Sequence, residues 1–126
     1  MPSPVTECVV ITFKPGVDLE TSGTDSAQVW SELLATVAKQ PGYQRSYWGH
    51  QLENPNIVLW LVDWDSLSAH QTFTSSPSYP GTIARLLPLT EHLHLHHFSP
   101  SVFPPRILGS APVIEFATFY GIKAVD

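Results

Sequence analysis

The spacing of apolar and polar positions changes along the chain, and the changes separate expected strands from expected helices. Residues 7–14, 43–50, 57–64 and 92–98 are rich in β-branched and aromatic side chains, and several are bounded by turn-forming residues, which is typical of strands. The stretch 57–64, IVLWLVDW, is apolar at nearly every position. That pattern predicts a central strand that is covered on both faces.

Two helices are expected between these strands. The first is expected to begin at Asp25, where an acidic residue and an amide three positions later form a capping-box pattern. Its apolar positions recur at the helical spacing i, i+3, i+4, i+7: Trp30, Leu33, Leu34 and Val37. The second helix is expected from Asp65 or Ser66 to about Phe73, with further helical turns over residues 82–87.

The order strand–helix–strand–strand–helix–strand predicts an α+β, ferredoxin-like domain over residues 1–100. Its four-stranded antiparallel sheet would have the strand order 4-1-3-2, with both helices on one face. The other face is expected to pair with a second copy and form a dimeric α/β barrel. Val10, the strand residues Val58, Trp60 and Val62, and three histidines are expected there. Residues 101–126 are expected to form a Pro-rich linker and one extra strand, either a swapped arm or the start of a second tandem copy.

Four of the six histidines fall within "HLHLHHF", residues 92–98. Alternation along a strand places His92, His94 and His96 on one face, and Leu93, Leu95 and His97 on the other. Same-face positions on one strand lie about 6.6 Å apart, so three imidazoles rarely converge on one ion. We therefore expect no metal site at these histidines and a polar dimer interface instead.

Glu7 and His97 are expected to meet. The last strand of this fold runs antiparallel to the first, so the end of one lies beside the start of the other, and both residues fall on the helix-covered face. A carboxylate beside an imidazole holds its tautomer and raises its pKa, which prepares a general base. The pair is therefore a candidate catalytic base, and a hydrogen bond at the strand ends is the alternative interpretation.

Composition narrows the possible partners. The formal net charge is −5 with six Lys and Arg, so no basic patch favours nucleic acid. Cys8 is the one cysteine, which excludes an intrachain disulfide and a thiolate metal cluster. No apolar run approaches the roughly 20 residues that a membrane helix needs. We expect a cytoplasmic homodimer that binds a small molecule, with no cofactor and no membrane contact.

Five segments carry a family resemblance: "ITFKPG", "YWGH", "WLVDWDSLSAHQTF", "SPSYPG" and "HFSP". In this order they resemble the dimeric α/β-barrel superfamily, which includes antibiotic-biosynthesis monooxygenases, plant olivetolic acid cyclase, a plant hydroxynitrile lyase and stress-responsive barrel proteins. The resemblance covers about residues 5–100. It implies two sheets that close into a barrel, with a pocket in each subunit between its sheet and its helices.

The resemblance also assigns candidate site residues. Phe73 stands where the cyclase has a catalytic tyrosine, and Tyr79 stands where it has a catalytic histidine, so its reaction does not carry over intact. Tyr79 is instead expected to donate a proton or orient a carbonyl. Trp64 and Phe73 are expected as pocket walls. The candidates for substrate contact also include Tyr47 and His50, although a surface turn suits that histidine as well.

His70, in the second expected helix, is interpreted as a packing or helix-surface residue. Three functions remain open from the sequence. The first is a cofactor-independent enzyme of polyketide-like metabolism that moves protons on an aromatic or carbonyl-bearing molecule, as a cyclase, lyase or isomerase. The second is a cofactor-free monooxygenase of the antibiotic-biosynthesis type. The third is a non-catalytic stress-responsive or ligand-binding barrel, which a pocket sealed by side chains would favour.

Overall fold

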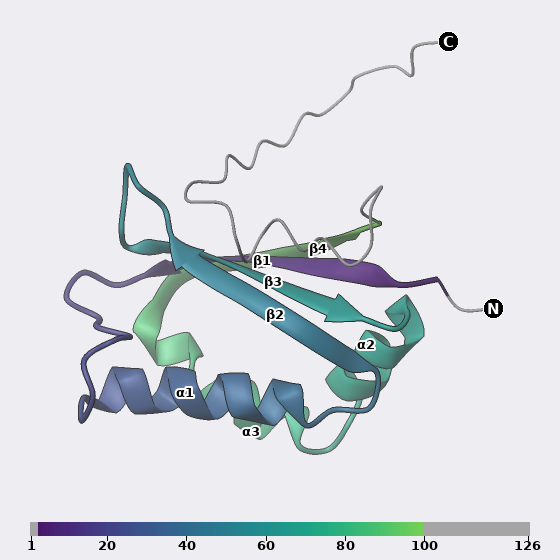
Figure 1. Ribbon diagram of the computed structural model, residues 1–126. Coiled ribbons are helices and arrows are strands. Elements are labelled where there is room, and N and C mark those ends of the chain that lie inside the picture. Colours follow the sequence, from purple (N-terminus) through teal and green to yellow (C-terminus); the bar gives the residue numbers. More distant parts are fainter. Residues whose placement is uncertain (1–2, 100–126) are drawn as a thin grey trace, which may run out of the picture.

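The elements follow the predicted order, with one further short helix before the last strand. The computed structural model describes residues 3–99, whose arrangement is shown in Figure 1. The strands are β1 (Val5–Phe13), β2 (Tyr43–His50), β3 (Ile57–Trp64) and β4 (Thr90–Phe98). The helices are α1 (Asp25–Ala38), α2 (Leu67–Thr74) and α3 (Tyr79–Ala84), and a 3₁₀ turn over Leu87–Leu89 leads into β4.

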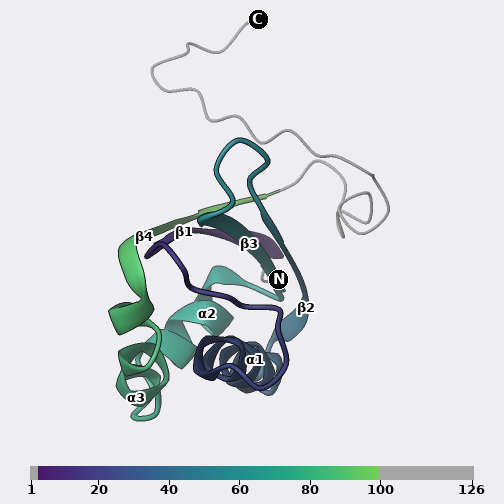
Figure 2. The same cartoon turned by 90° about the vertical axis from the view of Figure 1, so that its left-hand side faces the viewer.

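The four strands form one antiparallel sheet in the order β2-β3-β1-β4. All three helices lie on the same face of this sheet, as Figures 1 and 2 show from two sides. The predicted α+β ferredoxin-like fold is therefore confirmed. β3 lies between β2 and β1, which explains why its sequence is apolar at almost every position.

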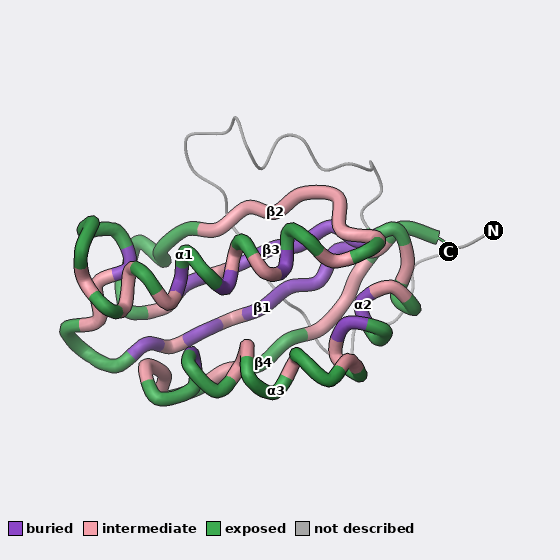
Figure 3. Tube along the Cα trace, turned by 90° about the horizontal axis from the view of Figure 1, so that it is seen from below, coloured by how far each residue is buried: buried purple, intermediate pink, exposed green. Residues whose placement is uncertain are grey.

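The core lies between the sheet and α1. Trp30 of α1 packs edge-to-face against Trp60 and Trp48, with ring centroids 5.3 Å apart in each pair, and against Phe13 at 6.0 Å. Buried positions run along β1 and β3, whereas β4 at the rim is largely exposed or half-buried (Figure 3). The helical face predicted for α1 is confirmed, because three of its four positions are buried: Trp30, Leu33 and Val37.

The predicted capping residue is correct for α2 but not for α1. Ser66 caps α2 as expected, because its hydroxyl accepts a hydrogen bond from the Ala69 amide at 3.1 Å. The capping box expected at Asp25 is wrong. Thr24 is the cap, and its hydroxyl accepts from the Ala27 amide at 3.2 Å. Asp25 lies in the first turn instead, where a negative charge favours the helix dipole.

The facing predicted for part of β3 is also wrong. Trp60 pairs with Val9 of β1, and paired residues share a face, so Trp60 and its alternate neighbours Val58 and Val62 point toward the helices. Alternation alone misleads here because both faces of β3 are apolar. The apolar residues of β1 and β3 that face away from the helices include Val10, Leu59 and Leu61.

The turn before β2 brings α2 close to the sheet. Gly42 has a positive φ of 86°, and a Cβ on this residue would lie 2.5 Å from the Ala69 Cβ of α2. The Asp65 amide also donates to the Gly42 carbonyl at 2.8 Å. Glycine at this position therefore allows α2 to pack against the end of the sheet where β3 stops.

Two expectations concern the last part of the chain. α3 begins at Tyr79, earlier than the expected turns over residues 82–87, so it includes Pro80 in its first turn. The expected linker and extra strand over residues 101–126 lie outside the described residues. Among residues 3–99, no helix is long and apolar enough to cross a membrane.

Candidate active site

The start of β1 and the ends of β3 and β4 meet at one edge of the sheet. Glu7 pairs with Val62 on β3 and with His97 on β4. The predicted meeting of Glu7 and His97 is therefore confirmed as a strand pairing. Because α2 follows β3 after two residues, its first turns lie over this same edge.

Glu7 is buried, with 6% of its surface exposed, and each of its carboxylate oxygens has a partner. Trp64 donates its indole Nε1–H to Oε1 at 3.1 Å. His70 of α2 places Nε2 3.2 Å from Oε2. Two ring nitrogens from two elements thus hold a carboxylate away from bulk water, a position that carboxylates take only when they are paired.

His70 also connects Glu7 to His97. The Nδ1 atom of His70 lies 2.7 Å from Nε2 of His97, and the two ring centroids are 4.8 Å apart. His70 is 5% exposed, and its ring also lies 5.2 Å from that of Trp64. The contact predicted between Glu7 and His97 is thus made through a third residue.

The pKa of His97 is shifted in the direction opposite to the prediction. Burial lowers the pKa of His97 below its usual value, and the neighbouring His70 lowers it further, while the charge of Glu7 acts in the opposite sense. Desolvation outweighs the carboxylate because His70 separates the two groups. The ring is therefore neutral near pH 7, the form in which an imidazole accepts a proton.

A small cavity of about 40 Å³ lies beside these residues. Its lining includes the polar residues Glu7, His70 and Tyr79 and the aromatic residues Trp60 and Trp64. The remaining lining is aliphatic: Val9, Leu33, Val37, Ile83, Leu86, Leu93 and Leu95. Small-molecule pockets usually measure about 300–1,000 Å³, so an aromatic substrate needs more space than this conformation provides.

Tyr79 begins α3 and borders the cavity opposite the sheet. Its ring packs edge-to-face on Phe73 at 5.1 Å, and Phe73 stacks on Trp64 at 6.2 Å. Burial raises the pKa of Tyr79, and the charge of Glu7 adds to that effect. The phenol therefore stays protonated near neutral pH and is able to donate a hydrogen bond, while its role as a proton donor to a substrate stays a prediction. Trp64 forms a cavity wall, with Phe73 packed behind it.

A model of the antibiotic biosynthesis monooxygenase family matches residues 8–85, more than half of the chain. The chain belongs to the antibiotic biosynthesis monooxygenase family. The matched span contains Trp64, His70 and Tyr79, whereas Glu7 lies directly before its start and His97 lies in β4, well after its end. A comparison with curated protein sequences found no significant match.

Solved structures share the fold of this family member. SnoaB from Streptomyces nogalater, a cofactor-independent oxygenase, superposes with a TM-score of 0.68 at 17% identity, over 82% of this chain and 98% of SnoaB. A conserved protein from Methanosarcina mazei Go1 superposes with a TM-score of 0.64 at 14% identity, over 77% of this chain and 92% of its own. At identities this low, the superpositions establish a common fold and nothing further.

Tyr47 and His50, which are predicted to contact a substrate, lie away from the cavity. Trp48 points to the helices, so its neighbour Tyr47 points to the opposite face of β2. His50 is at the far end of β2, where Nδ1 lies 2.8 Å from the Pro55 carbonyl oxygen and Nε2 lies 3.5 Å from Glu20. These contacts match the surface-turn interpretation of His50.

His70 is the site residue that the sequence interpretation underestimated. It lies on an eight-residue helix, and a helix this short offers few positions from which to identify its buried face. The spacing from Phe73 was the available signal: positions i and i+3 share a face, and Phe73 is an apolar residue that must be buried. Only packing against β1 and β4 shows that this face meets Glu7 and His97.

The three remaining strand histidines stand on the other face, as predicted from alternation. Cys8, Val10 and Thr12 of β1 pair with His96, His94 and His92. Among the described residues, no group of three or more His, Cys, Asp or Glu side chains is arranged to hold a metal ion. Burial raises the pKa of the Cys8 thiol to about 11, so its reactive thiolate form is scarce near neutral pH.

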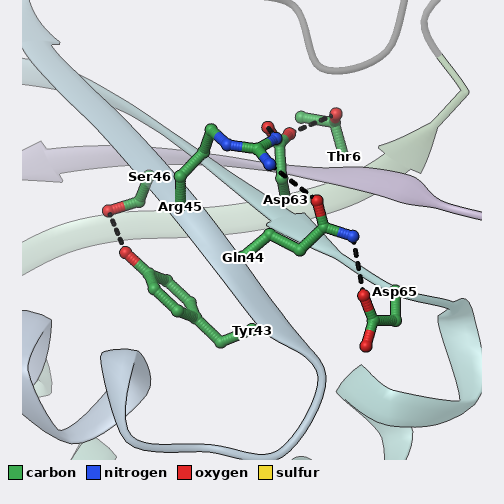
Figure 4. A network of polar contacts seen from close by, with 7 residues as sticks. All are labelled: Thr6, Tyr43, Gln44, Arg45, Ser46, Asp63 and Asp65. Carbon is green, nitrogen blue, oxygen red and sulfur yellow. Dashed lines mark hydrogen bonds and ion pairs between the residues drawn. The ribbon is translucent and has the colours of Figure 1, made fainter.

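A second polar cluster occupies the same sheet edge on this opposite face (Figure 4). Asp63 is 1% exposed; it accepts a hydrogen bond from the Thr6 hydroxyl at 2.7 Å and pairs with Arg45 at 2.8 Å. Arg45 also donates to Gln44 at 2.7 Å, and Gln44 donates to Asp65 at 2.6 Å. This network ties β1, β2 and β3 to the start of α2, and so stabilises the edge from which Glu7 and Trp64 project.

Proposed function

We propose that this protein is a cofactor-free enzyme that oxidises a neutral aromatic small molecule with molecular oxygen. The observation that carries the proposal is the pair Glu7 and His70, which lines an otherwise mostly apolar cavity and is joined to His97 through His70. A buried base of this kind removes protons from weak acids. Membership of the antibiotic biosynthesis monooxygenase family, and the likeness to SnoaB, favour oxygen as the second reactant.

The proposed reaction begins with loss of a proton from a quinol-type aromatic to the base. The resulting anion carries negative charge on a ring carbon, and this carbanion reduces oxygen and bonds to it as a hydroperoxide. Loss of water then leaves a carbonyl group. The substrate thus loses two hydrogens and gains one oxygen atom, while the second oxygen atom of O₂ leaves as water, and the substrate supplies every electron.

The cavity lining supports a neutral substrate. It contains no Lys or Arg among the described residues, and Glu7 is its one carboxylate. A carboxylated or phosphorylated ring end would meet a like charge in a poorly solvated site, which disfavours binding. The rings of Trp60, Trp64 and Tyr79 instead provide flat apolar surface for an aromatic ring.

The volume of about 40 Å³ requires the wall to move when a substrate enters. α3 is the wall with the weakest attachment: none of its residues is fully buried, and its cap residue Ser78 makes no side-chain capping bond. An ion pair between Arg85, just after α3, and Glu32 joins it to α1. Local stability is lowest where few apolar contacts are buried, so we expect α3 to swing outward.

Oxygen consumption with a quinol-type substrate tests the proposal. The purified protein, with chelator present, should consume one O₂ per substrate, and with ¹⁸O₂ the product carbonyl should carry one labelled atom. Glu7→Gln should slow both oxygen uptake and product formation, because it removes the charge of the base group. His94→Ala, on the opposite face of β4, is the matched control and should leave the rate unchanged.

The same assay decides between the functions. Substrate conversion without oxygen uptake, continuing under nitrogen, would contradict the oxygenase and support the cyclase, lyase or isomerase chemistry. Neither conversion nor oxygen uptake across neutral quinol-type substrates would contradict catalysis and support a non-catalytic stress-responsive or ligand-binding barrel.

A further inference from the structure

Glu7, His70 and His97 form a continuous chain from the interior to the surface. The two links measure 3.2 Å, from Glu7 Oε2 to His70 Nε2, and 2.7 Å, from His70 Nδ1 to His97 Nε2. Exposure increases along the chain, because Glu7 and His70 are buried and His97 is half-buried on the edge strand β4. Each of the two links therefore joins atoms that are able to donate or accept a proton.

The carboxylate determines where the ring protons lie. Ionised Glu7 only accepts hydrogen bonds, so neutral His70 must carry its proton on Nε2 to donate to it. The Nδ1 atom of His70 is then an acceptor, and His97 must carry its proton on Nε2 to donate to that atom. The remaining nitrogen, Nδ1 of His97, then carries a lone pair, and it belongs to the most exposed of the three residues.

We propose that these three residues form a proton relay in which a proton taken up at Nδ1 of His97 is stored on the carboxylate of Glu7. Two shifts accomplish the transfer. The Nε2 proton of His97 moves to Nδ1 of His70, and the Nε2 proton of His70 moves to Oε2 of Glu7. One proton enters, both rings end neutral with their protons on Nδ1, and Glu7 becomes a carboxylic acid.

The surroundings favour this neutral product over a buried imidazolium beside a carboxylate. His70 and Glu7 are almost fully buried, where separated charges are poorly solvated. The titratable groups near His97 are Glu7 on β1, His70 on α2 and the adjacent His96 on β4, while Tyr79 on α3 is near Glu7. Of these, Glu7 is the one carboxylate, so a proton that reaches it leaves no separated charges on the three residues.

The relay deepens the proposed function and rests on it for its catalytic meaning. In the oxidation, a substrate in the cavity gives its proton to Glu7, which lines that cavity together with His70. The relay run in reverse then carries a proton from Glu7 out to Nδ1 of His97. The forward relay returns the proton to Glu7, which gives it to the peroxide anion to form the hydroperoxide, and it leaves in the water molecule. His70 lies between Glu7 and His97 and contacts both, so it sets the tautomers of both rings.

The relay is testable in the resting protein, without substrate. Long-range ¹H–¹⁵N correlation spectra of ¹⁵N-histidine protein should show His70 and His97 neutral and protonated on Nε2 near pH 7.5. On acidification, one protonation step should convert both rings together to the Nδ1–H form. Infrared difference spectra should show the carbonyl band of a carboxylic acid at that step, absent in Glu7→Gln. His70→Gln should abolish the coupled change at His97.

Kinetics supply the second measurement. His97→Ala should lower kcat by about 10²-fold or more with little change in KM, because it removes the entry atom of the relay. Imidazole added to the buffer should restore part of the rate, because position 97 is half-buried on the edge strand β4, where imidazole is able to enter from solvent. His94→Ala should show neither the loss nor the rescue. This histidine is a cleaner control than His96, which contributes to the pKa of His97.

Each outcome bears on a different conclusion. A fully protonated imidazolium at His70 or His97, with Glu7 still ionised, would overturn the relay, as would an Nδ1–H ring at His70 in the resting state. Coupled tautomer changes in a protein that oxidises no quinol-type substrate would support the relay and contradict the proposed function. Oxidation that is insensitive to His97→Ala would support the function and contradict the relay.

Discussion

At the scale of single residues, the site depends on partners for one buried carboxylate. Trp64 and His70 each bond one oxygen of Glu7, and both reach it from elements that follow β2 in the chain. A buried charge costs several kcal/mol unless it is paired, so removal of either partner affects folding as well as chemistry. Assays of these variants therefore need a stability measurement beside the rate.

The pKa of His97 predicts how stability changes with pH. Folding lowers this pKa, so below the usual imidazole pKa of about 6.5 the unfolded chain binds the proton more readily than the folded protein. The contribution of His97 to the free energy of unfolding is therefore complete above about pH 6.5, and it is lost as the pH falls below this value. Urea unfolding at about pH 7.5 and 5.5 should show a smaller decrease in His97→Gln than in the wild type. Equal decreases in both proteins would contradict the assignment.

At the scale of secondary-structure elements, the contact between α2 and the turn before β2 positions His70. Ala69 occupies the space where a side chain at position 42 would lie, and the Asp65 amide bonds the carbonyl of the same glycine. α2 therefore has one favourable position over the sheet edge. A shift of this helix would separate His70 from both Glu7 and His97.

Gly42→Ala should destabilise the protein more than Gly23→Ala. Both glycines have positive φ, of 86° and 92°, so each substitution pays the backbone cost of about 1–2 kcal/mol. An added Cβ at position 23 meets open space, whereas at position 42 it would lie 2.5 Å from Ala69. Urea unfolding measures the difference. Ala69→Gly should recover part of the loss in the Gly42→Ala background, and equal losses in the two single variants would argue against this contact.

Leu86→Ala should enlarge the cavity. This side chain, two residues after α3, is 1% exposed and lines the cavity, so truncation should cost about 2–5 kcal/mol. The additional space should let the variant bind phenol more tightly than the wild type in an equilibrium titration. Leu87→Ala is the control, because Leu87 is 49% exposed, and it should change neither property. Unchanged phenol binding in a folded Leu86→Ala protein would mean that Leu86 does not limit the cavity.

At the scale of the whole molecule, the helices cover one face of the sheet and leave the other without a helix among residues 3–99. The face without helices includes Val10 and Leu59, which are half-buried, and Leu61, which is buried, beside the histidines of β4. An apolar sheet face in a protein is normally packed against another layer. A second copy of the chain remains our prediction for that layer.

Light scattering at micromolar concentration should therefore return about twice the monomer mass of 13.9 kDa. Leu59→Arg should give the monomer, because it places a charge in the centre of the proposed interface. Leu52→Arg, at a loop position that is 76% exposed, should leave the dimer intact. A stable wild-type monomer would contradict the prediction.

Much of the fold could be predicted from local pattern and topology. The order of elements, the strand order and the pairing of Glu7 with His97 follow from the spacing of apolar residues and from the geometry of antiparallel strands. β4 could be oriented because Leu93 and Leu95 differ sharply from the histidines between them. β3 could not, because both of its faces are apolar and alternation carries no information there.

The sequence by itself determined which residues could do chemistry here, and tertiary structure decided how they connect. Glu7 and His97 are 90 positions apart, and β-pairing rules bring them together. His70 reaches the space between them because Gly42 lets α2 approach the sheet, a contact that no local pattern encodes. The direction of the His97 pKa shift and the size of the cavity depend on the packing of side chains from several elements. These are properties of distances and burial, which exist only once the chain has folded.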